Sequence, residues 1–212
     1  MLANIDKRKR VKHHASMPYA QVPALIQQIG PNPNPSAKAL LFGIITSTRT
    51  SETIEATWGE FDLENKLWII PKARMKRSIE HRVPLSDQAV ELLKSITKVD
   101  GSSWVFNGHS RKKSEQIKPL SNAAMSTYLK NTLGYKAFTV HGFRSSFRDW
   151  AGETTTHTRE VIEHALAHGL ANQTEAAYQR GDYLEKRRAL MTDWSNYCFG
   201  SREALNPQPL AT

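Results

Sequence analysis

Apolar residues recur along most of the chain at the spacing of one helix face. One such run begins after Ser36 and ends near Thr48, and it predicts a helix with Ser36 as its N-cap. Its apolar positions, such as Leu40 and Ile44, are expected in the core. The same spacing predicts further helices over residues 21–29, 86–96, 121–133, 142–152, 158–167 and 183–199.

The stretch between residues 60 and 85 has a different pattern. Short runs rich in apolar and β-branched residues, at 67–70 and 82–85, predict two strands, and the connection between them, 71–81, is long and strongly basic. These features indicate a small antiparallel sheet with an extended basic tip. We therefore expect a mainly α fold with a small antiparallel β-sheet.

The length of 212 residues is that of one sizeable domain, which can bury a large core. Residues 1–17 are basic and have no apolar periodicity, so they resemble a linker that is either a solvated tail or a segment following a DNA backbone. Residues 201–212 contain prolines that cannot continue the last helix, and we expect a disordered tail there. The globular domain is accordingly predicted over residues 18–200.

The charge is strongly positive, with 29 Lys and Arg against 20 Asp and Glu, or a formal +9. A positive surplus on a folded domain indicates a polyanionic partner, most often nucleic acid, although an anionic membrane surface satisfies the same balance.

The single cysteine, Cys198, excludes an internally disulfide-bonded scaffold and fits a reducing compartment. The longest apolar stretch, 39–45, is far shorter than the roughly 20 residues of a membrane span. We expect a cytoplasmic protein.

Residues able to do chemistry lie in four separate places along the chain. Each one alone is most often a solvated charge or a packed ring. Together they offer two guanidiniums, two imidazoles, an ammonium and a phenol, which suit a phosphodiester whose transition state spreads negative charge over its oxygens. The set comprises Arg49 with Glu52, Lys76, His141 with Arg144, and His168 with Tyr178.

Two of the histidines also fit a metal site. His164 and His168 are four residues apart, which is also a spacing of zinc ligands on a helix. The glutamate expected after the first histidine is Ala165, and no cysteine cluster completes the set, so we predict no metal and no cofactor. The other histidines are expected as polar surface or turn residues; they are His13, His14, His81, His109 and His157.

Four segments in a fixed order resemble the sequence boxes of the tyrosine recombinases, and within them the integrases of phages and genomic islands. They are 48–52 with its arginine, 70–86 with its lysine, the His-Gly-Phe-Arg run 141–144, and 166–178 with its histidine and tyrosine. The resemblance covers most of the chain and implies the recombinase catalytic-domain fold, of the DNA breaking-rejoining type. Ser51 departs from the pattern, because glycine often precedes the box glutamate.

The resemblance implies a role for each matched residue. Tyr178 would attack the scissile phosphorus, and Arg49 and Arg144 would clamp the phosphate, a task that suits the rigid donor fork of a guanidinium. Lys76 would protonate the leaving 5′-oxygen. The remaining assignments are His141 for proton movement at the nucleophile, His168 as a donor to a non-bridging oxygen, Glu52 as a supporting group, and Arg74, Arg77 and Arg82 for DNA binding.

The expected partner is double-stranded DNA at attachment sites, with four protomers assembled on DNA and a monomer in solution compatible with the sequence. Exchange of one phosphodiester for another requires no ATP and implies no metal. Relatives usually carry further N-terminal DNA-binding modules, so the alternative is a truncated DNA-binding remnant without recombination activity. A topoisomerase-like enzyme of the same chemistry is a third hypothesis.

Overall fold

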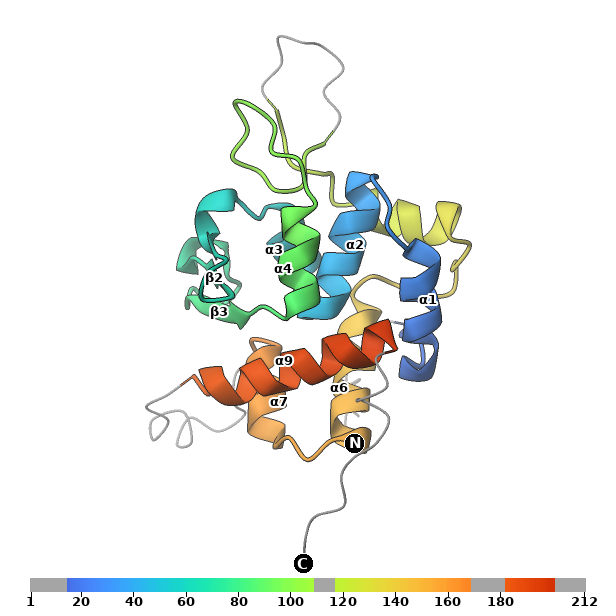
Figure 1. The fold of residues 1–212 in the computed structure, drawn as a ribbon. Helices are drawn as coiled ribbons and strands as arrows, with labels where there is room; N and C mark the ends of the chain where they lie inside the picture. Colours follow the sequence, from blue (N-terminus) through green and yellow to red (C-terminus); the bar gives the residue numbers. More distant parts are fainter. Residues whose placement is uncertain (1–14, 109–116, 169–181, 201–212) are drawn as a thin grey trace, which may run out of the picture.

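The computed structural model describes residues 15–108, 117–168 and 182–200. Helices surround a central helix, and a small sheet lies to one side (Figure 1). This confirms the predicted mainly α fold with a small antiparallel sheet. The α-helices are α1 (Val22–Ile29), α2 (Pro35–Thr46), α3 (Thr50–Ile54), α4 (Asp87–Lys94), α5 (Ala124–Thr127), α6 (Gly142–Thr154), α7 (Arg159–Ala165) and α9 (Leu184–Phe199). Short 3-10 turns are η1 (Tyr19–Gln21), η2 (Trp58–Glu60) and η3 (Lys72–Arg74), and η4 (Tyr128–Thr132) is a π-helical continuation of α5.

The central helix is α2, which packs against α1, α3, α4, α5 and α9. It is apolar on nearly every side, as a helix enclosed by others must be. Its predicted cap is wrong by two residues, because the Asn34 side chain accepts from the Ser36 backbone N–H at 2.8 Å. Pro35 explains the shift, since proline favours the first helical position, immediately after the cap.

The sheet has three strands in the order β1–β2–β3, all antiparallel. The two predicted strands are β2 (Leu67–Ile70) and β3 (His81–Pro84), and a short β1 (Phe61–Asp62) adds an edge that the sequence did not indicate. The Trp68 ring is fully buried and stacks on the Phe61 ring at 5.2 Å between centroids. This aromatic contact fixes the sheet to the core, because Trp68 also meets Phe42 of α2.

Two predicted helix starts have different outcomes. Ser86 caps α4 as predicted, with its hydroxyl accepting from the Ala89 N–H at 3.2 Å. Ser121 does not cap a helix; its carbonyl closes a turn with the Ala124 N–H at 2.9 Å, and α5 begins only there. Tyr128, which follows α5, is buried in the core.

The last helix, α9, crosses α6 and α7 and packs against both (Figure 1). The Trp194 indole donates to the Ile44 carbonyl of α2 at 2.9 Å, and Cys198 is buried as an ordinary packed side chain. Arg187 is only 1% exposed; its Nε donates to the Asp182 carbonyl at 2.6 Å and its Nη1 to the Arg82 carbonyl of β3. The buried guanidinium therefore ties α9 to the sheet.

Candidate active site

Arg49 stands at the start of α3 and is held by Glu52, one turn later. The Glu52 carboxylate accepts from the Arg49 backbone N–H at 2.8 Å and from guanidinium Nη1 at 2.5 Å. Glu52 is 2% exposed while the Arg49 side chain is 21% exposed. An acid in the third helical position can accept from the backbone N–H of the N-cap residue, here Arg49, so the start of the helix orients Arg49. The other amino group of the guanidinium, Nη2, donates to the Ala167 carbonyl at 3.3 Å.

Arg144 lies on the first turn of α6 and is 5% exposed. Its Nη1 donates to the Ser47 carbonyl at the end of α2, and its Nη2 donates to the Leu166 carbonyl at 2.5 Å. Burial, followed by the charge of Arg49, lowers the pKa of Arg144 to about 10, so it remains a cation at neutral pH. Its Nε, buried, has no partner among the described residues.

His168 follows α7 and joins this group through its ring. Nε2 lies 3.2 Å from Nη2 of Arg144, and Nδ1 lies 2.7 Å from Oε2 of Glu163. The backbone turn is a Schellman motif, in which the His168 N–H bonds to the Glu163 carbonyl and the Ala167 N–H to the His164 carbonyl. Ala167 has a φ of +49°, a conformation that glycine usually occupies. This turn directs the imidazole back toward Arg144.

The end of α7 is where these groups meet. Two successive carbonyls accept hydrogen bonds from distant parts of the chain: Leu166 from Arg144, and Ala167 from Arg49. His81 is 9% exposed, so its expectation as a surface or turn residue is wrong. Burial, and then the charge of Arg187, lowers the pKa of His81 to about 4, so the ring is neutral at physiological pH.

Of the other predicted site residues, His141 is the exposed residue before α6, and its carbonyl accepts from the Arg144 N–H at 3.2 Å. Lys76 is exposed in the connection from β2 to β3. It takes no part in the hydrogen bonds described at the end of α7. Tyr178 lies outside the described residues. The structure thus brings Arg49, Arg144 and His168 together, with His141 in the adjoining turn.

The three arginines expected to bind DNA differ in their surroundings. Arg77 is exposed on the basic connection. The Arg82 side chain is 41% exposed and pairs with Asp182 at 3.3 Å. Arg74 is turned inward, pairing with Glu60 at 2.5 Å and donating to the Glu52 carbonyl at 2.6 Å. Arg74 therefore fixes the connection to α3.

Three residues that support this site were not predicted from the sequence. His81 could have been found from strand alternation, because it shares the buried face of β3 with Val83. Glu163 and Arg148, which form an ion pair at 2.7 Å, carry no such signal. Glu163 precedes His168 by five residues, which is not a helical contact spacing.

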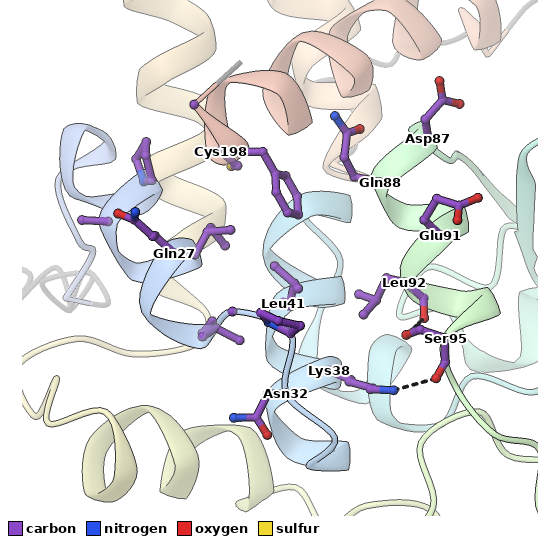
Figure 2. Close-up of a pocket in the computed structure, with 18 of the residues that line it drawn as sticks. Gln27, Asn32, Lys38, Leu41, Asp87, Gln88, Glu91, Leu92, Ser95 and Cys198 are labelled. Atoms are coloured by element: carbon purple, nitrogen blue, oxygen red, sulfur yellow. Dashed lines mark hydrogen bonds between the residues drawn. The ribbon is translucent and has the colours of Figure 1, made fainter. Parts of the chain in front are cut away.

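A separate pocket of about 1360 Å³ lies between α1, α2, α4 and the end of α9, and none of the predicted site residues lines it. Figure 2 shows Lys38 of α2 reaching across it to the Ser95 carbonyl, at 2.8 Å.

Within the described ranges there is no group of three or more His, Cys, Asp or Glu side chains that could hold a metal ion. No helix in the part of the chain that the structure describes is long and apolar enough to cross a membrane.

Comparison with known proteins gives one family. The model described as "Phage integrase family" matches residues 16–185. Prophage integrase IntA of Escherichia coli (strain K12) is 36% identical over 157 residues, or 74% of this chain and 37% of the relative. Prophage integrase IntZ of the same strain is 34% identical over 92% of this chain and 48% of its own length, and the integrase of enterobacteria phage P4 is 29% identical over 89% and 46%. This chain therefore spans about half or less of each of these relatives. No solved structure matches.

Proposed function

Because the chain belongs to the phage integrase family, we propose that it is the catalytic domain of a site-specific DNA recombinase, with residues 18–200 as the globular unit. It would cleave and rejoin duplex DNA through a 3′-phosphotyrosine at Tyr178, and so integrate or excise phage or island DNA. The observation that carries the proposal is the convergence of Arg49, Arg144 and His168 at the end of α7. Two guanidiniums and an imidazole lie side by side there, a set suited to bind one phosphate.

The reaction exchanges one bond to phosphorus for another of the same kind. The Tyr178 oxygen forms a bond to phosphorus while the bond to the 5′-oxygen breaks, and the phenolic proton leaves as the 5′-hydroxyl gains one. A phenol has a pKa near 10, so its attack at neutral pH needs a base or a positive field, which His141 and the two arginines would supply. Lys76, on the exposed basic connection, would protonate the leaving oxygen.

Arg144 and Arg49 are suited to different parts of the clamp. Arg144 is buried, and two backbone carbonyls fix its plane, so its position costs little reorganisation when a phosphate arrives. Arg49 is partly exposed and oriented by Glu52, so it can reach a second oxygen. This division supports a single, preorganised phosphate site rather than a diffuse basic surface.

We propose double-stranded DNA as the partner and a tetramer on DNA as the active assembly, acting in the bacterial cytoplasm, where the chromosome lies. Arg77 and Arg82 are suited to phosphate contacts. Arg74 is bound within the protein, and we assign it to holding the basic connection in place. The presence of all six expected catalytic residues in this chain favours the enzyme over a truncated DNA-binding remnant.

A covalent-adduct assay tests the proposal. The purified chain is incubated with a nicked duplex carrying an attachment site, so that cleavage releases a short strand and traps the protein on DNA. We expect an adduct with the wild type, none with Tyr178→Phe, and an unchanged yield with Tyr135→Phe, a matched loss of one phenolic hydroxyl. An adduct in the Tyr178→Phe variant would exclude Tyr178 as the nucleophile. Binding without any adduct would favour the remnant.

A further inference from the structure

Both ring nitrogens of His168 have a partner that fixes the placement of hydrogen. A guanidinium only donates, so Nε2, 3.2 Å from Nη2 of Arg144, faces it as an acceptor. An ionised carboxylate only accepts, so Nδ1, 2.7 Å from Oε2 of Glu163, carries the proton. The two neighbours therefore select one neutral tautomer, with hydrogen on Nδ1.

Glu163 is itself held from several sides. Its second oxygen, Oε1, accepts from Nε of Arg148 on α6 at 2.7 Å, and its main-chain carbonyl accepts from the His168 N–H at 2.9 Å. The side chain is 15% exposed. A carboxylate fixed by another helix and by the turn that follows it presents Oε2 in one direction, which determines where the His168 ring can lie.

The charges facing His168 are those of Glu163, Arg144 and Arg49. Burial lowers the pKa of His168; the Glu163 carboxylate opposes that shift, and both arginines reinforce it. Burial also acts on Glu163, but the hydrogen bonds from His168 and Arg148 outweigh it and lower the pKa of this carboxyl, so Glu163 is an anion at neutral pH.

We propose that Glu163 is a positioning residue for phosphoryl transfer. It holds the proton of His168 on Nδ1, the nitrogen that faces Glu163, and so directs Nε2 toward the phosphate beside Arg144. This inference rests on the proposed function. In the resting site Nε2 accepts from Arg144, so it can donate to a phosphate oxygen only after it takes up a proton from solvent. The anion of Glu163 stabilises the resulting imidazolium. Strand cleavage accordingly requires cationic His168 and slows as the pH rises.

The arrangement is tested first in the protein alone by nitrogen NMR of the imidazole, with the His168 signals assigned by a His168→Gln variant. We expect the Nδ1–H tautomer in the wild type. We expect Glu163→Gln, which keeps the volume and removes the charge, to lower the measured pKa of His168 by about 1. Glu160→Gln removes an exposed carboxylate from the same helix and should leave it unchanged. An Nε2–H tautomer in the wild type, or an unchanged pKa in Glu163→Gln, overturns the proposal.

The catalytic consequence is tested by the rate of adduct formation across pH. In Glu163→Gln the decline at high pH should move to lower pH, with a rate about tenfold lower on that limb, because one unit of pKa is a tenfold change in the protonated fraction. Glu160→Gln should follow the wild type. A rate reduced equally at every pH would mark a merely structural role and overturn the inference. A wild type that forms no adduct overturns the proposed function and the catalytic part of this inference, whereas the NMR result stands independently.

Discussion

The substitution His81→Gln, which replaces a buried histidine of β3, should change how the unfolding free energy of the protein depends on pH. His81 is 9% exposed, and burial together with the charge of Arg187 lowers its pKa to about 4, although the backbone of Ala165 opposes this shift. Glutamine is polar and of similar size but does not titrate in this range. The variant therefore removes the protonation equilibrium while it keeps a polar side chain at the same buried position of β3.

The magnitude follows from linkage. The folded-state pKa lies below the unfolded value of 6.5, so the unfolded chain binds more protons between these two values. The unfolding free energy contributed by neutral His81 is fully present above the unfolded pKa and is lost as the pH falls toward the folded one. Between about pH 7 and about pH 5 the loss amounts to about 2 kcal/mol.

Urea unfolding followed by tryptophan fluorescence at several pH values measures this difference. Carboxylates such as Glu163, and His168 as well, also have lowered pKa values, so both proteins lose stability in acid. The informative quantity is the unfolding free energy of the wild type minus that of His81→Gln. This difference should be about 2 kcal/mol lower near pH 5 than near pH 7. Parallel pH curves for the two proteins, with the same dependence of the unfolding free energy on urea concentration, would refute a buried neutral His81.

Two further predictions concern backbone geometry near the site, and both are measured by urea unfolding. Ala167→Gly should raise the unfolding free energy by up to about 1 kcal/mol, because Ala167 has a φ of +49°; a loss of stability would contradict the Schellman turn. Gly142→Ala should lower it by about 2 kcal/mol, because a Cβ there would lie 2.3 Å from the Ala15 carbonyl oxygen. Gly152→Ala, on the same helix with open space around it, is the control and should be neutral or stabilising.

Local signals allowed most of the helices and the two main strands to be predicted. Ser86 and its following apolar repeat define α4 within a short window, and the structure confirms this start. Where a stronger local preference intervened, the prediction failed: Pro35 moved the cap of α2 from Ser36 to Asn34. The sequence has no comparable signal for β1, which is only two residues long.

The side chains of the site could be nominated from the sequence, but their supports could not. Arg49 and the Ala167 carbonyl are 118 positions apart, and any residue supplies a carbonyl, so nothing in the sequence marks Ala167 as an acceptor. The inward turn of Arg74 has the same origin, because its partners include the Glu52 carbonyl. Residue type indicates which groups can do chemistry, while the tertiary structure decides which backbone atoms hold them.

The two successive carbonyls at the end of α7, those of Leu166 and Ala167, make the site tolerant of one kind of mutation and sensitive to another. Exchanging the side chain at either position leaves both oxygens in the backbone. Inserting or deleting a single residue between Glu163 and Leu166 would rotate both acceptors by about 100° around the helix axis and misalign two anchors at once. Evolutionary drift in this turn should therefore appear as substitutions at constant length.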